Sequence, residues 1–401
     1  MTPSAPNPMT PLAWLRALSG DHSPLEMPWT RSGASAEAAE FHRVVLALEW
    51  EAATTARARA LLLARALLWP AASLLRAVKL TRRHGASVAL RHGVGAARQL
   101  WQQVACANLL NIGPDAYYRY RLYLPGNRRR ALEFVQHFET SLLGLERIRQ
   151  DGSHDLDHKV AFHDHCRAVG LPTVPILATF EAGRLARWYG AGPCALPPCD
   201  LVLKPCQLYS GEGVECWRWD AARATWLRDG TEQADLLEHA RRSSLVHPCL
   251  LQAVLNIPTG RSDINNFDTG GLAALVDVSS GRLGPAFGKD LAAEHLAAHP
   301  TTGAPILGRR LERLEEMVGL CLAAHAHVSE LHSIGWDVVP TPEGPLLLEA
   351  NTIWDVEMAQ QASGEPLAVV LRGDGVVARR VARGGARRWS TRQTPHLPRG
   401  A

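Results

Sequence analysis

Lysine is scarce in this chain. Of the 401 residues 43 are basic, and only Lys79, Lys159, Lys204 and Lys289 are lysines, which leaves 39 arginines. A composition that uses arginine for ordinary positive charge makes each remaining lysine a candidate for a place that needs a compact, mobile point charge. An excess of charge is also lacking, because the net charge is only +4, and aromatic residues make up 6% of the chain. Without a strong basic excess or alternating aromatic and basic positions, the chain is not expected to bind nucleic acid.

Features that mark exported or membrane-spanning proteins are missing as well. The eight cysteines include no C-x-x-C pair, which argues against a disulfide framework and predicts reduced thiols. The longest apolar run, Ala66–Leu75, is ten residues long and contains Pro70, whereas a membrane-spanning helix needs about 20 apolar residues. Residues 1–10 contain three prolines and no basic segment followed by an apolar one, so they do not resemble a signal peptide. We therefore expect a cytoplasmic protein without a membrane span.

The composition divides the chain into four segments. Residues 1–40 are rich in Pro, Ser and Ala and are expected to be disordered, as is the basic tail 373–401. Residues 41–150 carry a helical pattern of Ala, Leu and Arg. Between residues 151 and 372, short apolar runs alternate with turns that contain Gly and Pro, and helical patterns lie between some of them. This predicts a helical region followed by an α+β domain with mixed, largely antiparallel sheets.

The helical region contains a basic stretch, Arg57–Arg83, without any acidic residue. We expect its helical pattern to be broken at Pro70 and at Gly85. One interpretation of the stretch is a solvated helix face. The other is a helix that lies on a membrane surface, because its cationic side chains flank a face of leucine and tryptophan. Under the second interpretation the protein is cytoplasmic and peripheral to a membrane.

The C-terminal part contains a predicted hairpin, Ile334–Asn351, whose apolar strands flank Pro342-Glu343-Gly344. A three-residue loop with glycine in its last position places Asp337 directly opposite Glu349. Strand alternation then puts Asn351 on the same face as Glu349. Facing carboxylates repel each other unless a positive charge lies between them. Two carboxylates and an amide carbonyl suit Mg²⁺, and the alternative is an ordinary acidic pair on an exposed sheet face.

A second candidate site lies where an apolar strand ends on Lys204. The loop that follows carries Ser210, Gly211 and Gly213, and glycines let backbone N–H groups approach phosphate oxygens closely. The lysine adds a mobile charge at the same place. The loop is not a Walker A motif, because no Gly-Lys-Ser/Thr opens a helix there, and a plain hairpin is the alternative.

Two further segments carry groups suited to phosphate. Lys159 falls in the first turn of a predicted helix, Asp157–Val169, where a cation opposes the helix dipole unless it and the helix end hold an anion together. A solvated lysine is the alternative. The segment Asn265–Gly271, NNFDTGG, offers amide and backbone donors for a terminal phosphate, with a simple turn as the alternative.

Taken together and in this order, the four segments resemble the ATP-grasp superfamily. The likeness is closer to its sugar-transfer-associated branch, which is predicted to act in cell-surface polysaccharide biosynthesis. It spans roughly residues 100–362 and rests most on the motifs GGLAALVDVSSGRLGPAF (270–287), HPTTG (299–303), IGWD (334–337), EGPLLLEAN (343–351) and Gln360-Gln361.

The resemblance implies a role for each group of residues. The residues that would bind ATP are Lys159, Lys204, Ser210, Gly211, Gly213, Gln252 and Asn266. Of these, Lys159 and Lys204 would contact the α and β phosphates, and Lys204 and Asn266 would take part in catalysis, with Asn266 near the γ-phosphate. The residues that would ligate Mg²⁺ are Asp337, Glu349 and Asn351.

The resemblance also implies a reaction. Such enzymes transfer the γ-phosphoryl group of ATP to a carboxylate, and an amine, thiol or similar nucleophile then displaces phosphate from the acyl phosphate. The chain is therefore expected to be a Mg-ATP-dependent carboxylate ligase. Its partners would be ATP and a carboxylate-bearing small molecule or glycan precursor.

The chain departs from the family pattern in two places. Gln252-Ala253 stand where the family usually has an acidic residue beside the adenine. Only Leu255–Ile264 separate that strand from Asn265, where the family normally inserts two more strands that bear an arginine, and Arg261 is the nearest substitute. The shortened segment favours a second hypothesis, a nucleotide-binding scaffold without catalysis. The complete set of metal ligands favours an enzyme, because a scaffold needs no metal.

Overall fold

The computed structural model describes residues 22–25, 35–151, 156–190, 195–208, 212–228, 231–232, 235–253, 271–288, 291, 295–373 and 377. Several residues singled out in the sequence lie outside these ranges, namely Ser210, Gly211, Arg261, Asn266 and Lys289. Most of the N-terminal segment expected to be disordered and nearly all of the basic tail also lie outside them. Within the described residues the fold is a mixture of helices and antiparallel sheets with a helical N-terminal region, as the sequence predicted.

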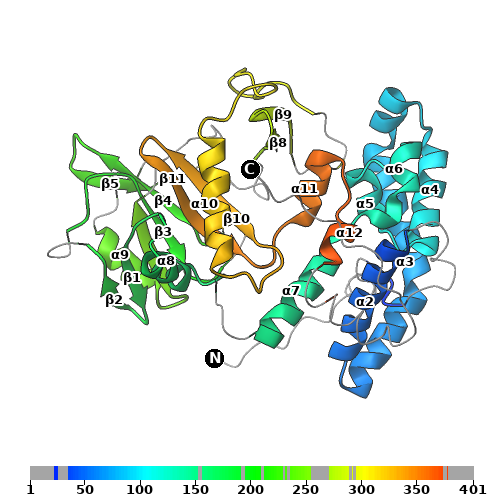
Figure 1. Ribbon diagram of the computed structural model, residues 1–401, viewed down its shortest axis with the longest axis horizontal. Coiled ribbons are helices and arrows are strands. Elements are labelled where there is room, and N and C mark those ends of the chain that lie inside the picture. The colour runs from blue at the N-terminus through cyan, green and yellow to red at the C-terminus, as the bar shows by residue number, and fades with distance from the viewer. Residues whose placement is uncertain are drawn as a thin grey trace, which may run out of the picture.

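Helices fill the N-terminal region, which forms the right-hand side of Figure 1. Their bounds are α2 (Ala36–Ala52), α3 (Ala56–His92), α4 (Ala96–Leu109), α5 (Pro114–Arg119), α6 (Pro125–Arg129), the 3-10 turn η2 (Ala131–Glu133) and α7 (His137–Asp151). Helix α2 begins inside the segment 1–40 because the Ser35 hydroxyl caps it by accepting a hydrogen bond from the N–H of Ala38 at 3.2 Å.

Helix α3 runs for 37 residues through both positions at which we expected a break, so that expectation was wrong. Beside Pro70, the Trp69 side chain is buried and donates from Nε1 to the Ala107 carbonyl of α4 at 2.9 Å. Gly85 is also buried against α4, where Gln99 donates from Nε2 to the Gly85 carbonyl at 2.9 Å. Packing along the helix therefore outweighs the cost of a proline, about 3 kcal/mol, and of a glycine, about 1 kcal/mol.

The α/β part is built on one large sheet. Its elements are α8 (Lys159–Ala168), β1 (Ile176–Glu181), β2 (Arg184–Trp188), β3 (Leu201–Pro205), β4 (Glu215–Asp220), β5 (Thr225–Arg228), β6 (Thr231–Glu232), α9 (Leu236–Ser243) and β7 (Cys249–Ala253). The strand order is β2-β1-β7-β3-β4-β5-β6, and each neighbouring pair is antiparallel. Helix α9 packs on one face through Leu236 and Ala240, which contact a buried layer that includes Leu201, Leu203 and Leu251. The opposite face carries a smaller apolar cluster that includes Ile176, Cys206 and Leu250.

Two hairpins and three helices complete the chain. They are β8 (Ala273–Asp277) with β9 (Arg282–Phe287), α10 (Leu314–Ala326), β10 (Gly335–Thr341) with β11 (Gly344–Asn351), α11 (Val356–Ser363) and α12 (Ala368–Leu371). Helices α8 and α10 bury one face of the β10–β11 hairpin, where Phe162 and Leu320 belong to the same apolar cluster as Leu347 and Ala350. The hairpin is also tied to the start of β1, because the N–H of Val174 donates to the Leu347 carbonyl at 3.0 Å.

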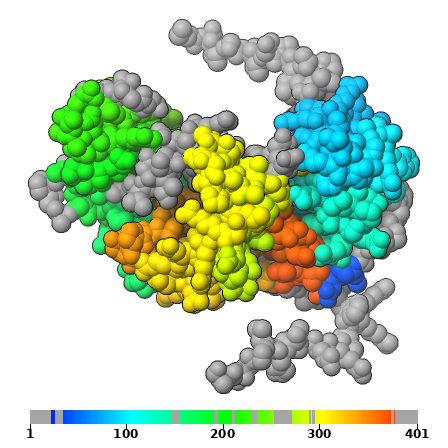
Figure 2. Space-filling model, turned by 90° about the horizontal axis from the view of Figure 1, so that it is seen from above, coloured from blue at the N-terminus to red at the C-terminus, as the bar shows by residue number. Residues whose placement is uncertain are grey.

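Helices α11 and α12 return to the N-terminal region. Val356 and Leu371 lie in one apolar cluster with Phe41 and Val45 of α2. The buried Gln360 amide accepts from the N–H of Val135 at 3.0 Å and donates to its carbonyl at 2.8 Å. Figure 2 shows the result, with the green sheet lobe and the cyan helices at opposite ends and the yellow and orange residues between them.

Candidate functional site

The sheet carries Lys204 on the face opposite helix α9. In an antiparallel pair, residues directly across from each other point to the same face. Lys204 is opposite Leu250, and Val202 is opposite Gln252, so Lys204 and Gln252 share a face and the leucines that contact α9 point the other way. Only 7% of the surface of Lys204 is exposed. Strand alternation alone thus places two of the predicted site residues side by side on one sheet face.

Lys159 approaches the same face from the first residue of helix α8. Its N–H donates to the Cys206 carbonyl at 3.0 Å, and its ammonium group donates to the Leu208 carbonyl at 2.8 Å. Both acceptors lie just after Lys204 in the chain. The start of α8 is therefore fastened to the first residues of the predicted phosphate loop, and Lys159 is not a solvated lysine.

The hairpin supplies the carboxylates. Asp337 is the cross-strand partner of Glu349, and Gly335 is the partner of Asn351, as the sequence predicted. The route to this pairing differs from the predicted one. Thr341 pairs with Gly344, which leaves a two-residue turn, and a bulge between Asp337 and Val338 shifts the register by one residue.

The bulge also decides which residues face the site. Val338 pairs with Leu347, whose side chain is fully buried in the cluster under α8 and α10. Glu349 is only two residues away and would share the face of Leu347 in a regular strand. The extra residue, Leu348, turns Glu349 to the other face, together with Asp337.

The two lysines and two carboxylates meet at one place. The Glu349 carboxylate lies 3.6 Å from the Lys159 ammonium group. The charges of Glu349, Lys159 and Asp337 all act on Lys204. Burial lowers the pKa of Lys204 to about 8, and Lys159 adds to this shift, whereas the two carboxylates oppose it. The result is a partly desolvated cluster of alternating charge that joins α8, β3, β10 and β11.

Asp337 responds to the same surroundings. Loss of water around its carboxyl group, the charge of Glu349 and a hydrogen bond between the two carboxyl groups all raise the pKa of Asp337, and Lys204 and Lys159 act in the opposite direction. Asp337 is nevertheless exposed at its strand position, so solvent screens part of the shift. Two carboxyl groups in contact, with an amide-bearing Asn351 two residues further along the same face, form an oxygen donor set that suits Mg²⁺. No group of three or more His, Cys, Asp or Glu side chains arranged for a metal occurs among the described residues.

The glycine loop is described only in part. Gly213 has a left-handed backbone with φ of +70°, and a Cβ atom there would lie 2.8 Å from Cγ of Pro205. Any other residue at this position would be strained and would press on the end of β3. Gly213 therefore has a structural reason to be glycine, in addition to its predicted role near phosphate.

Gln252 is the remaining predicted ligand among the described residues. It is buried, and its Nε2 donates to the Val174 carbonyl at 3.3 Å. Its Oε1 is buried without a hydrogen-bond partner in the described part of the chain. A buried acceptor without a donor is costly, so this oxygen is suited to a donor from a ligand.

One residue that supports the site was not found from the sequence. Asp157 accepts from the N–H of Thr352 through Oδ1 at 2.9 Å, and its Oδ2 contacts the Thr352 hydroxyl. This contact holds the segment before Lys159 against the end of β11, next to Asn351. The two partners are 195 residues apart in the chain, so local sequence gives no signal for the pairing.

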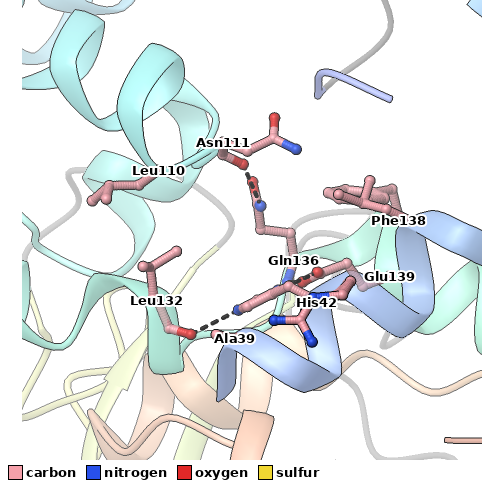
Figure 3. Close-up of a pocket in the computed structure, with 10 residues that line it drawn as sticks. Ala39, His42, Leu110, Asn111, Leu132, Gln136, Phe138 and Glu139 are labelled. Carbon is pink, nitrogen blue, oxygen red and sulfur yellow. Dashed lines mark hydrogen bonds and ion pairs between the residues drawn. The ribbon is translucent and has the colours of Figure 1, made fainter. Parts of the chain in front are cut away.

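A pocket in the helical region is a separate feature (Figure 3). It is lined by Ala39, His42, Arg43, Leu46, Leu110, Asn111, Leu132, Gln136, Phe138 and Glu139. His42 contacts acceptors on both ring nitrogens, Glu139 at Nδ1 and the Leu132 carbonyl at Nε2, 2.7 Å away, so both nitrogens donate. Burial alone would lower the pKa of His42, but the charge of Glu139 and the two hydrogen bonds outweigh it and raise the pKa. These polar groups hold α2 to α7, and none of them belongs to the lysine–carboxylate cluster.

Comparison with known proteins bears on the same residues. The sequence model of the sugar-transfer associated ATP-grasp family matches residues 246–373. The match covers less than half of the chain, and it confirms the resemblance seen in the motifs. The match includes Gln252, Asp337, Glu349 and Asn351 but ends short of both lysines.

Solved structures and curated proteins give little further similarity. Among solved structures, that of the D-cycloserine synthetase DcsG is similar over 56% of this chain and 71% of its own, with 13% sequence identity and a TM-score of 0.31. No protein in the curated set matches the sequence.

Proposed function

We propose that the protein is a Mg-ATP-dependent ligase of ATP-grasp type that activates a carboxylate, and that it serves the assembly of a surface polysaccharide. The observation that carries this proposal is the meeting of Lys159 and Lys204 with Asp337 and Glu349. Phosphate and divalent metal need charges of opposite sign within a few ångströms of each other. Four separate elements of this fold bring those charges together, and two of them lie in the segment that matches the family.

Each residue then has a task that follows from its position. Lys204 and Lys159 would hold the phosphates of ATP and balance the negative charge that builds up during transfer. Gln252 Oε1, which lacks a partner among the described residues, would accept from the amino group of adenine. Asp337, Glu349 and Asn351 would hold Mg²⁺, which supplies positive charge against the phosphate oxygens when bound.

The proposed reaction is a phosphoryl transfer followed by a substitution. A carboxylate oxygen of the acceptor attacks the γ-phosphorus of ATP, the bond to the bridging oxygen breaks, and ADP leaves. The acyl phosphate that results is attacked by an amine or similar nucleophile, and inorganic phosphate leaves with the C–O bond electrons. The residues of the cluster contribute position and charge, which is where catalysis of phosphoryl transfer largely resides.

A nucleotide-binding scaffold without catalysis is the second candidate. It is favoured by the short segment between Gln252 and Asn266, which leaves little room for the strands that usually carry an arginine to the triphosphate. That segment, residues 254–270, lies outside the described residues. The two candidates share ATP binding and differ only in turnover.

Calorimetry with wild-type protein and Mg-ATP tests the ATP binding that both candidates require. Mg-ATP is expected to bind, and ADP is expected to form when a panel of small carboxylates, including sugar acids and amino acids, is supplied with an amine. Binding without ADP release across the panel would favour the scaffold. A protein that does not bind Mg-ATP would exclude both.

The low pKa of Lys204 gives a further expectation for ATP binding. The lysine is charged below its pKa of about 8 and loses its charge above it, so affinity for Mg-ATP should fall by up to about tenfold per pH unit as the pH rises beyond that value. Calorimetric titrations at steps across pH 7 to 9.5 measure this slope, and Lys204→Gln serves as the control that should show no such decline. A wild-type affinity that stays constant above the pKa would remove Lys204 from the phosphate site.

A further inference from the structure

Helix α3 exposes a continuous apolar face. Leu67 is 82% exposed, and Leu61, Leu63, Leu74 and Leu75 are between 44% and 59% exposed. At 3.6 residues per turn these side chains fall on neighbouring rows of the helix, away from the buried row that contains Trp69 and contacts α4. Soluble monomers rarely expose a contiguous apolar patch of this kind unless it binds something.

Cationic side chains lie at both ends of this apolar face. Arg57 lies one turn before Leu61 on the same row, and Lys79 lies one turn after Leu75, followed by Arg82. All three are exposed. Three other cations of the stretch are engaged elsewhere: Arg65 pairs with Glu49 at 2.6 Å, Arg76 pairs with Asp115, and Arg59 donates to the Ala53 carbonyl at 3.1 Å. An apolar strip about 20 Å long, at 1.5 Å per residue, thus has a positively charged residue at each end.

We propose that this face of α3, from Arg57 to Arg82, docks the protein on the surface of a membrane that contains anionic lipid. Leucines would enter the boundary between head groups and acyl chains, and the cations at each end would contact lipid phosphates and carboxylates. The face contains no acidic residue that would be repelled by such a surface. This places the enzyme site on a protein that works at a membrane.

A second copy of the chain fits the face less well. Two such helices packed on each other, parallel or antiparallel, would bring Arg57, Lys79 and Arg82 near like charges and offer no acidic partner from the same stretch. A docked lipid surface meets the same cations with opposite charge.

A membrane-spanning α3 is also less suitable. Among the described residues, α3 is the one helix long and apolar enough to span a bilayer by length and composition, which the ten-residue apolar run had not led us to expect. Spanning would require Trp69 and Ser73, both fully buried against the rest of the protein, to leave that packing. Lying on the surface requires no such change.

Sedimentation of the full-length protein with vesicles tests the proposal. Vesicles of phosphatidylcholine alone are compared with vesicles that contain about 30% phosphatidylserine, at low salt and at about 0.5 M NaCl. Wild-type protein is expected to sediment with the anionic vesicles, with at least about tenfold weaker binding to the neutral ones, and to be released by salt. Salt-resistant binding to both kinds of vesicle would indicate a spanning helix and overturn the proposal.

Matched substitutions localise the binding. Leu67→Glu should weaken vesicle binding by about tenfold or more, and Lys79→Glu with Arg82→Glu should abolish the preference for anionic lipid. Leu90→Glu is the control, because Leu90 is on the same helix and 89% exposed but lies beyond the cationic end of the face. Since Leu67 is so exposed, thermal melts of these variants should match wild type.

The remaining outcomes decide against the proposal. Equal loss of binding in Leu67→Glu and Leu90→Glu would show that the face has no special role. A wild-type protein that ignores vesicles but forms a dimer disrupted by Leu67→Glu would assign the face to a second copy. A monomer that ignores vesicles would mean that another part of the chain covers the face.

Discussion

Lys204→Gln is expected to lower ATP-dependent turnover by on the order of 10³-fold, the loss seen when a charge that stabilises phosphoryl transfer is removed. Glutamine keeps much of the length of lysine but cannot balance phosphate charge. Lys204→Arg should rescue little of the activity, because a planar guanidinium does not fit a side chain site that is only 7% exposed. ADP formation under saturating Mg-ATP measures both variants.

The thermal stability of Lys204→Gln should not fall with its turnover, and this distinguishes a lost catalytic charge from misfolding. The pKa of Lys204 is lower in the folded protein, about 8, than its ordinary value of 10.5. The charged lysine therefore destabilises the fold at neutral pH by roughly 3 kcal/mol, at about 1.4 kcal/mol per pKa unit. The Tm of Lys204→Gln, measured by circular dichroism at pH 7, is expected to equal or exceed that of wild type. A lower Tm together with lost activity would assign Lys204 a structural role instead.

Glu349→Gln is expected to change the affinity for Mg-ATP and the affinity for metal-free ATP in different ways. Loss of one carboxylate from the proposed Mg²⁺ ligands should weaken Mg-ATP binding by about 100-fold or more. ATP in the presence of a chelator should bind at least as well as to wild type, because one negative charge has been removed from beside the phosphates. Calorimetry with each form of ATP gives the two affinities.

The same hairpin offers a matched control for this variant. Glu343→Gln makes the same chemical change in the exposed turn between β10 and β11, and both affinities should stay at their wild-type values. If Glu349→Gln instead weakened the two forms of ATP equally, Glu349 would act on the fold of the site or on Lys159, not on the metal.

The sequence predicted the parts of the site that depend on local pattern. Strand alternation and a three-residue loop predicted Asp337 opposite Glu349, and the structure has the same pair by a different route. The turn has two residues and not three, and the bulge at Leu348 restores the predicted pairing. A bulge adds a residue without changing the apolar pattern much, so the sequence alone does not distinguish the two routes.

Contacts between segments far apart in the chain could not be predicted from local sequence patterns. The break expected at Pro70 is absent because α4 packs along α3, and intrinsic propensity does not include that packing. The Asp157–Thr352 contact, which aligns Lys159 with the end of β11, joins residues with no local relation. Four strands, β2, β5, β6 and β9, were also not anticipated, and the exposed or half-exposed side chains of β2 and β5 give a weak alternating signal.

The packing of α11 and α12 against the helical region determines how the two halves of the chain are connected. Since Val356 and Leu371 share a core with Phe41 and Val45 of α2, the α/β part is an insertion between the first and last elements of one helical domain. Cutting the chain near residue 150 would therefore remove Val356 and Leu371 from the cluster that they share with α2. Helix α3 and the β10–β11 hairpin are thus connected through one helical core, because the end of β11 lies only nine residues before the Gln360 amide that holds Val135.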